Sequence, residues 1–260
     1  MFDSRWLKII AIVLMTVDHV GGFLLPEGSA SYTVLRAIGR LAYPLFAFII
    51  AYGCTKTRNI SMYFLRLIAF AVVLQTLWAI AGFVYSDLTP YFNNIFFTLA
   101  FGVLAIWIIK YMRRNAPVKN GTDLAVFAFF ACVFTLVICV GADFLQVDYG
   151  GAGVLLIVMF FVMFQVVPYG AEQNSTGGTK HHESKDWILC IAVPIVILVI
   201  FNTILFLLRN WEIQWYSMLA APLIWLFRPR KLKIHWLEKY FFYIYYPLHI
   251  AILCAISVLV

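Results

Sequence analysis

Charged side chains are scarce in this sequence of 260 residues. Lys, Arg, Asp and Glu together make up 12% of it, whereas 64% of the residues are hydrophobic, and the mean hydropathy is +0.92. A soluble domain cannot bury that much apolar surface, because too little polar surface remains to cover it. The apolar runs are continuous and do not alternate, which excludes a transmembrane β-barrel. The composition predicts an all-α, polytopic bundle of transmembrane helices.

Other absences narrow the class further. The net charge of +7 comes from basic residues in short loops between apolar runs, so we expect no nucleic-acid partner. No stretch is polar enough for a separate soluble domain, and we predict one integral membrane domain over residues 1–260. No internal repeat suggests a transporter built from inverted halves. The five cysteines show no metal-type pairing, and no metal is predicted; they are Cys54, Cys132, Cys139, Cys190 and Cys254.

Nine apolar segments have the length expected of membrane spans or approach it. The eighth is short, and residues 170–186 form a polar loop expected to be flexible and cytoplasmic. Lys and Arg collect in alternate loops, beginning before the first span, which predicts a cytoplasmic N-terminus and, after nine crossings, an external C-terminus. The predicted spans are residues 7–25, 34–54, 62–84, 94–112, 123–143, 150–168, 187–208, 215–228 and 236–259.

Ionisable and amide side chains inside these spans are candidates for function, because buried charge is costly in a bilayer. At 1.5 Å per residue, the candidates lie about 18 to 22 Å from the cytoplasmic face. This predicted polar layer contains Asp18, His19, Arg40, Gln75, Asn202 and His249, with Asn93, Asn94 and Thr98 at its outer side.

Depth alone does not show that these side chains face one another. Gln75 and Asn202 are equally consistent with simple hydrogen bonds between helices. Arg36 is interpreted as reaching the outer headgroups, whereas the deeper Arg40 needs a carboxylate partner. Asp18 is the obvious candidate for that partner. A helix turns by about 100° per residue, so the Asp18 side chain points away from His19 and toward a neighbouring helix.

Lys8 and His19 are predicted to share one face of the first helix. Eleven residues turn the helix by about 1100°, within about 20° of three full turns, and separate the two along the axis by about 16.5 Å. A cation at the cytoplasmic end and an imidazole deep in the membrane suit an elongated, phosphorylated cosubstrate. Arg66, one turn inside the third span, is a second candidate for its phosphates.

Five blocks of the sequence together resemble the TraX family, whose best-known members N-acetylate conjugative pilin. They are "LKIIAIVLMTVDHVGGFLLP", "LRAIGRLAYPLFAFIIAYGCTKTRN", "NNIFFTLAFGVLAI", "VDYGGAGVLLIV" and "FFYIYYPLHIAIL". The resemblance covers most of the chain in the right order. It extends to a broader superfamily of membrane acyltransferases, in which a basic residue of the first helix precedes a His by eleven positions, as Lys8 precedes His19.

The resemblance implies a bacterial cytoplasmic membrane protein with acetyl-CoA as cosubstrate and His19 as the catalytic imidazole. Its motif positions here are Arg36, Arg40, Asn93, Asn94, Asp148, Tyr149, Tyr246 and His249. The acceptor would be an amine or hydroxyl that is extracytoplasmic or embedded in the membrane, such as a peptide or pilin N-terminus or a glycan. The main alternative is a transporter whose Asp/His/Arg layer serves as a proton relay or substrate site.

Overall fold

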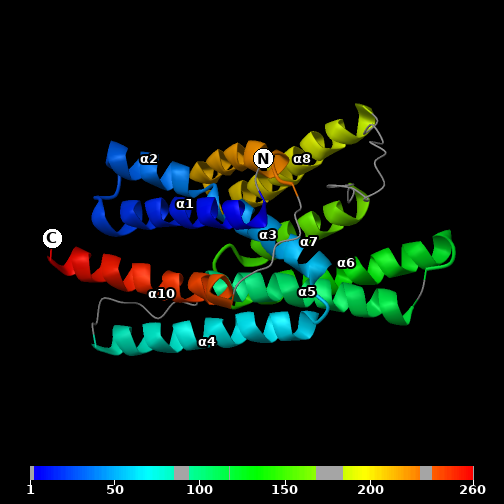
Figure 1. Ribbon diagram of the computed structural model, residues 1–260, viewed down its shortest axis with the longest axis horizontal. Coiled ribbons are helices and arrows are strands. Elements are labelled where there is room, and N and C mark those ends of the chain that lie inside the picture. The colour runs from blue at the N-terminus through cyan, green and yellow to red at the C-terminus, as the bar shows by residue number, and fades with distance from the viewer. Residues whose placement is uncertain (1–2, 85–93, 117, 168–183, 229–235, 260) are drawn as a thin grey trace. The chain divides into compact units, whose positions relative to one another are not determined.

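The computed structural model describes residues 3–84, 94–116, 118–167, 184–228 and 236–259. Those residues form helices joined by short connections, with no strand among them (Figure 1). Six of the helical segments are long and apolar enough to cross a membrane, and Gly150–Val166 and Phe241–Ser257 are shorter apolar helices. The predicted all-α fold is confirmed, and the protein is a multi-pass membrane protein.

The helices fall into two compact units. The first contains Met1–Ile49 and Met163–Val260, and the second contains Ile50–Val162. The single domain expected for residues 1–260 stays a prediction.

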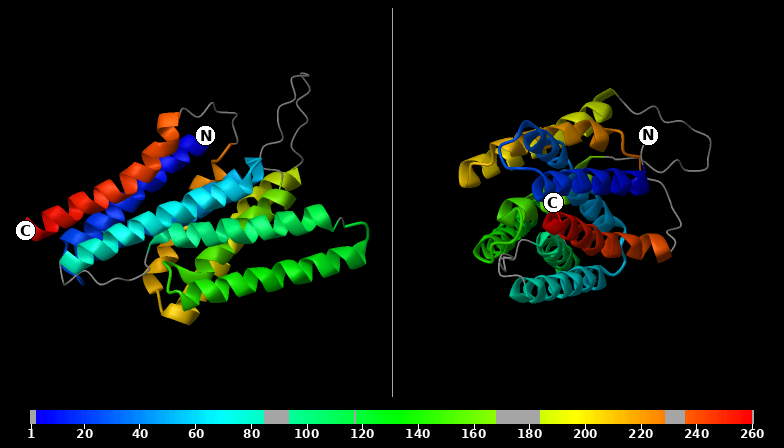
Figure 2. Two further views of the ribbon diagram at one scale, coloured as in Figure 1. Left: turned by 90° about the horizontal axis from the view of Figure 1, so that it is seen from below. Right: turned by 90° about the vertical axis from the view of Figure 1, so that its left-hand side faces the viewer.

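The first unit is built around α1 (Ser4–Leu24), with α2 (Ala30–Gly39) and α10 (Trp236–Leu259) beside it (Figures 1 and 2). Asp3 begins α1, because its side chain accepts hydrogen bonds from the N–H groups of Arg5 and Trp6 at 2.9 and 3.2 Å. Ser29 caps α2 in the same way, through the N–H of Tyr32. These side chains satisfy backbone donors that a helix leaves open in its first turn.

The second predicted span, 34–54, is broken by a turn at residues 40 and 41. The chain forms α2 and then α3 (Ala42–Lys56). Pro44 lies in the first turn of α3, where a backbone N–H has no partner within the helix, so its absence breaks no hydrogen bond. If α2 continued into α3, the proline ring would clash with the carbonyl group of the preceding turn. The predicted span lies within Ala30–Lys56, one of the six segments able to cross a membrane, but this segment is two helices with a turn between them. The break puts Arg40 at the C-terminal end of α2.

The first unit continues with α8 (Ser184–Arg209), the 3₁₀ helix η1 (Glu212–Ala220) and α9 (Ala221–Trp225). The eighth predicted span, 215–228, is therefore not a regular α-helix. A 3₁₀ helix rises about 2 Å per residue, so η1 and α9 together extend about 25 Å, further than an α-helix of the same length. This tighter winding lets a short segment cover most of a hydrocarbon layer of about 30 Å.

Contacts between α1 and α10 fix the direction of the last helix. Lys8 lies over the ring of Phe242, Thr16 contacts Tyr245 and His19 contacts His249. Residue numbers rise together in all three pairs, so the two helices run parallel. A first and a last span that run in the same direction are what a chain with an odd number of membrane crossings must have.

The second unit contains α4 (Ile60–Val84), α5 (Ile95–Asn115), α6 (Gly121–Phe144), most of α7 (Gly150–Val166) and the end of α3. Helices α5 and α7 carry much of the buried surface of this unit. Gly102 lets α5 approach Ile157 of α7 closely, since a Cβ there would lie 2.5 Å from the Ile157 side chain. Helix α6 instead exposes large apolar side chains such as Phe129 and Leu136, as expected of a surface that faces lipid.

Candidate active site

Two adjacent residues of α1 point to two different helices. Asp18 contacts α2 through Arg36 and Arg40, whereas His19 contacts α10 through His249. The sequence predicts this separation, because successive residues of a helix differ by about 100° in direction. The pair that looks like one unit in the sequence therefore belongs to two clusters.

The first cluster is a buried ion network. Nη2 of Arg40 lies 2.5 and 2.7 Å from the two carboxylate oxygens of Asp18, and Nη1 of Arg36 lies 2.6 Å from Oδ2. The expected pairing of Asp18 with Arg40 is present. The interpretation that Arg36 reaches the headgroups was wrong, because its guanidinium turns inward to the same carboxylate and lies near the ring of Tyr32.

The turn that ends α2 supports this network. Nε of Arg40 donates to the carbonyl oxygen of Arg36 at 3.3 Å. The same carbonyl oxygen accepts from the backbone N–H of Arg40 at 3.1 Å, so two donors of Arg40 hold the last turn of α2. Gly39 packs directly against Asp18, and a Cβ at Gly39 would overlap the Asp18 side chain. Gly21 of α1 meets Leu35 in a similar way. Small residues thus let two membrane helices approach closely enough for the ion pairs to form.

The second cluster joins His19 to His249. Nδ1 of His19 lies 2.7 Å from Nε2 of His249, and the planes of the two rings are within 12° of parallel. Nδ1 of His249 lies 2.9 Å from the carbonyl oxygen of Tyr245, one turn back on α10. The three groups form a continuous hydrogen-bonded chain across the α1–α10 contact.

This chain fixes the tautomers of two neutral imidazoles. A carbonyl oxygen can only accept, so Nδ1 of His249 carries a proton and its Nε2 is an acceptor. Nδ1 of His19 must then be the donor, which leaves Nε2 of His19 with an unshared electron pair. A histidine held in this way is ready to act as a base or a nucleophile.

Aromatic rings enclose the histidine pair. The ring of Tyr246 meets His19 and His249 edge to face, with centroids 6.3 and 5.5 Å away. Phe23 covers His19 from its own helix at 6.1 Å. The imidazoles therefore lie in an apolar setting, where a hydrogen bond is stronger than in water.

Lys8 lies on the same side of α1 as His19, as the helical register predicts. Its Nζ is 5.3 Å from the centre of the Phe242 ring, while His19 meets His249 further along the same partner helix. The ammonium of Lys8 and the imidazole of His19 therefore lie on the face of α1 that contacts α10, Lys8 near one end of this contact and His19 further along it.

A family model described as TraX protein matches residues 4–257. The chain belongs to the TraX family. All the residues of both clusters fall within the matched region.

Two relatives of this TraX-family chain extend the comparison. A probable fimbrial assembly protein FimC, serogroup H1, of Dichelobacter nodosus is 29% identical over 260 residues, which is 98% of this chain and 95% of the relative. An uncharacterized protein, RP591, of Rickettsia prowazekii (strain Madrid E) is 25% identical over 202 residues, covering 78% of this chain and 65% of that protein. No solved structure matches the chain significantly.

Four further candidate residues lie in the second unit. They are Arg66, which the sequence suggested, and Asn94, Asp148 and Tyr149, which the TraX resemblance suggested. Arg66 donates to the carbonyl oxygen of Met62 on its own helix. Asn94 is buried and caps α5, while its Nδ2 donates to the carbonyl oxygen of Ala71 at 3.0 Å. The Asn94 amide thus caps the start of α5 with its oxygen and links α5 to α4 with its nitrogen. Asn93 lies outside the described residues.

Asp148 and Tyr149 occupy the turn between α6 and α7. The carbonyl oxygen of Asp148 accepts a hydrogen bond from the Thr98 hydroxyl of α5. Tyr149 is buried and has φ of 58°, a left-handed conformation that is uncommon for a residue with a side chain. The second unit thus holds this turn in one conformation through α5.

The structure also identifies residues that sequence reasoning missed. Tyr245 and Thr16 contact each other between α10 and α1, and Gly39 makes room for Asp18. Ser217 of η1 is a further such residue. It donates a hydrogen bond at 3.0 Å to Asn202, a candidate of the predicted polar layer, which thus makes the hydrogen bond between helices that was its alternative interpretation. The block "YYPLH" carries Tyr245 as well as Tyr246, but the sequence alone gives no reason to prefer the first tyrosine.

Proposed function

We propose that this TraX-family protein is a membrane acyltransferase. It moves an acetyl group from cytoplasmic acetyl-CoA to an amine or hydroxyl of an acceptor that is extracytoplasmic or embedded in the membrane. The observation that carries the proposal is the chain from Tyr245 through His249 to His19, which leaves Nε2 of His19 unprotonated. A hydrogen-bonded imidazole of this kind is the usual group for activating an acceptor in acyl transfer.

In the proposed reaction, Nε2 of His19 removes a proton from the acceptor nitrogen or oxygen as that atom attacks the thioester carbonyl. A bond forms between acceptor and carbonyl carbon, the carbon–sulfur bond breaks, and the imidazolium returns its proton to the leaving thiolate. Transient transfer of the acetyl group to His19 would use the same nitrogen. His249 stabilises the imidazolium because its Nε2 accepts from Nδ1 of His19.

The donor would extend along α1. Lys8 would hold the phosphates of CoA, and the pantetheine arm would cover the distance of about 16.5 Å to His19. The ammonium of Lys8 lies over the ring of Phe242, near one end of the contact between α1 and α10.

The cluster of Asp18, Arg36 and Arg40 would supply positive charge near the reaction. Two guanidinium groups meet a single carboxylate, so the network carries a net positive charge. Such charge stabilises the oxyanion that develops at the thioester carbonyl, and its effect is large where water is excluded.

The acceptor is proposed from the family and from the D. nodosus relative. That relative is named a probable fimbrial assembly protein, which favours a peptide or pilin N-terminus over a glycan. The transporter alternative is less well supported, because the hydrogen-bonded chain from His19 ends at a backbone carbonyl oxygen, which cannot pass a proton on.

The test is acetyl transfer from radiolabelled acetyl-CoA by protein reconstituted in lipid vesicles with an apolar peptide that has a free N-terminus. We expect label on the peptide and release of CoA with the natural protein, and neither with His19→Ala. Thr203→Val is the matched control, because Thr203 bonds only the carbonyl oxygen of Val199 on its own helix. Equal transfer by His19→Ala and the natural protein would rule out the assignment, whereas movement of a solute without any acyl donor would favour a transporter.

A further inference from the structure

The geometry points to Tyr245 as a positioning residue that sets the orientation and tautomer of the histidine pair. The expected effect of Tyr245 on turnover rests on the proposed function, whereas its effect on the orientation and tautomers of the histidines does not. Tyr245 makes three separate contacts with the cluster, through its hydroxyl, its carbonyl oxygen and its ring. Together they tie α10 to α1 beside the two imidazoles.

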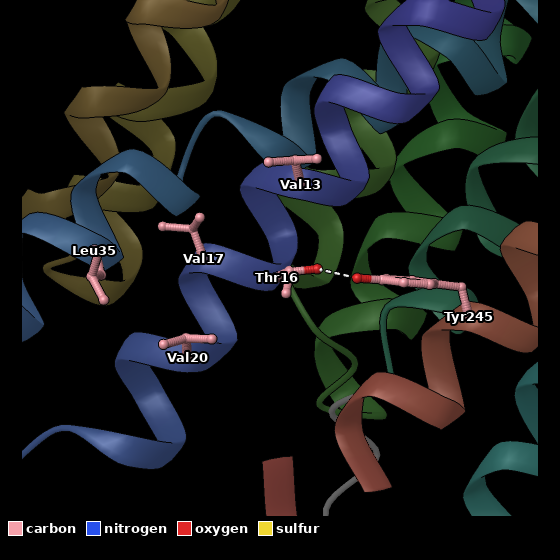
Figure 3. Close-up of a pocket in the computed structure, with 6 residues that line it drawn as sticks. All are labelled: Val13, Thr16, Val17, Val20, Leu35 and Tyr245. Atoms are coloured by element: carbon pink, nitrogen blue, oxygen red, sulfur yellow. Dashed lines mark hydrogen bonds between the residues drawn. The ribbon is translucent and has the colours of Figure 1, made fainter. Parts of the chain in front are cut away.

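The hydroxyl contact has a defined direction. Oγ1 of Thr16 donates to the carbonyl oxygen of Ile12 at 2.9 Å, which uses its only proton. The hydroxyl of Tyr245, 2.8 Å from Oγ1, must therefore donate to Thr16 (Figure 3). This is a hydrogen bond between helices, one turn of α1 away from His19.

The other two contacts act on His249. The carbonyl oxygen of Tyr245 accepts from Nδ1 of His249 and so decides which nitrogen of that ring faces His19. The Tyr245 ring lies 5.1 Å from the His249 ring and within 14° of parallel to it. A shift of Tyr245 would therefore rotate His249 and weaken its bond to His19.

Tyr245 also lines an open groove with a volume of about 230 Å³. The lining is apolar apart from the two hydroxyl groups that bond each other (Figure 3). The Thr16–Tyr245 bond thus lies at the edge of the contact between α1 and α10, while the ring of Tyr245 stacks on His249. The lining residues are Val13, Thr16, Val17, Val20, Leu35 and Tyr245.

The experiment measures the tautomers directly and the turnover separately. Full-length protein carrying ¹⁵N-histidine is reconstituted in lipid nanodiscs, and the imidazole nitrogens are assigned by comparison with His19→Gln and His249→Gln. In the natural protein we expect Nδ1 protonated and Nε2 unprotonated on both rings. Tyr245→Phe and Thr16→Val keep the carbonyl oxygen of residue 245 but remove the bond that ties α10 to α1. The His19–His249 bond should then loosen and the tautomers of His249 should mix, while Thr16→Ser, which keeps the hydroxyl, should retain the natural spectrum.

Turnover supplies the second readout. Loss of one hydrogen bond between neutral groups should lower kcat about tenfold in Tyr245→Phe, with the KM for acetyl-CoA unchanged. Thr16→Val should match it, and the double variant should be no worse than either single one, because both remove the same contact. The control Thr203→Val should change neither spectrum nor kcat.

The outcomes separate this inference from the proposed function. A natural tautomer pattern in Tyr245→Phe would overturn the positioning role even if the protein transfers acetyl groups. Mixed tautomers in a protein that transfers nothing would support the positioning role and reject the acyltransferase. Equal losses in Thr203→Val and Thr16→Val would mean that any lost hydroxyl disturbs the bundle, and would also overturn it.

Discussion

Nδ1 of His19 and Nε2 of His249 lie 2.7 Å apart, although 230 positions separate the two residues in the chain. Because His249 also donates to a backbone carbonyl oxygen, both of its ring nitrogens are engaged within the protein. His249 therefore orients His19, and in the proposed reaction Nε2 of His19 is the nitrogen that would meet the acceptor.

Replacements at position 249 should separate orientation from general loss. His249→Leu should lower kcat about 100-fold, because the proton on Nδ1 of His19 loses its acceptor. His249→Gln should lose only about tenfold, since an amide oxygen can accept the same hydrogen bond. Steady-state release of CoA measures both. If Gln and Leu were equally inactive, simple acceptance of that hydrogen bond would not explain the role of His249.

The buried ion network should matter for stability as well as for the proposed reaction. Asp18→Asn leaves two guanidinium groups without a carboxylate, and such a loss costs about 3–5 kcal/mol for buried charges. Arg40→Gln should be more damaging than Arg36→Gln, because the Arg40 side chain is 9% exposed and that of Arg36 is 27% exposed. Denaturant unfolding in detergent micelles, followed by tryptophan fluorescence, would measure the differences. The reverse order for the two arginines would contradict this assignment of burial.

Gly39 should tolerate no larger residue. Gly39→Ala places a methyl group on the Asp18 side chain and should force α2 away from α1, at a cost of about 1–3 kcal/mol. Gly141→Ala is the matched control, because nothing lies within 4 Å of the position of its Cβ. Thermal unfolding of the two variants should differ clearly. An equal and small effect in both would mean that α1 and α2 are less closely packed than described.

Lys8 should affect donor binding more than chemistry. If its ammonium holds the phosphates of acetyl-CoA, Lys8→Ala raises the apparent donor KM about tenfold or more and changes kcat less. Lys8→Arg should keep most of the affinity, because the charge stays at the end of the α1–α10 contact. Initial rates at varied acetyl-CoA concentration test this. An unchanged KM in Lys8→Ala would remove Lys8 from that role.

Much of the fold is determined by the sequence, because its signals are local. Long apolar runs predict membrane helices whatever they pack against, and the structure follows most of the predicted spans. The fixed rotation of a helix likewise separates Asp18 from His19 and aligns Lys8 with His19. Two predicted spans are not single α-helices. The helix of the second span is interrupted just before Pro44, and residues 212–225 form a 3₁₀ helix followed by one short α-helix.

The partners of those residues were decided by the tertiary structure. The rotation and sliding of α10 against α1 depend on packing along the whole contact, so no local pattern shows that His249 rather than Tyr246 bonds His19. The inward turn of Arg36 depends in the same way on Gly39, which brings α2 close to Asp18. The sequence alone predicted an imidazole, a carboxylate and cations at matching depths, and helix packing joined them into a hydrogen-bonded histidine pair and an ion network.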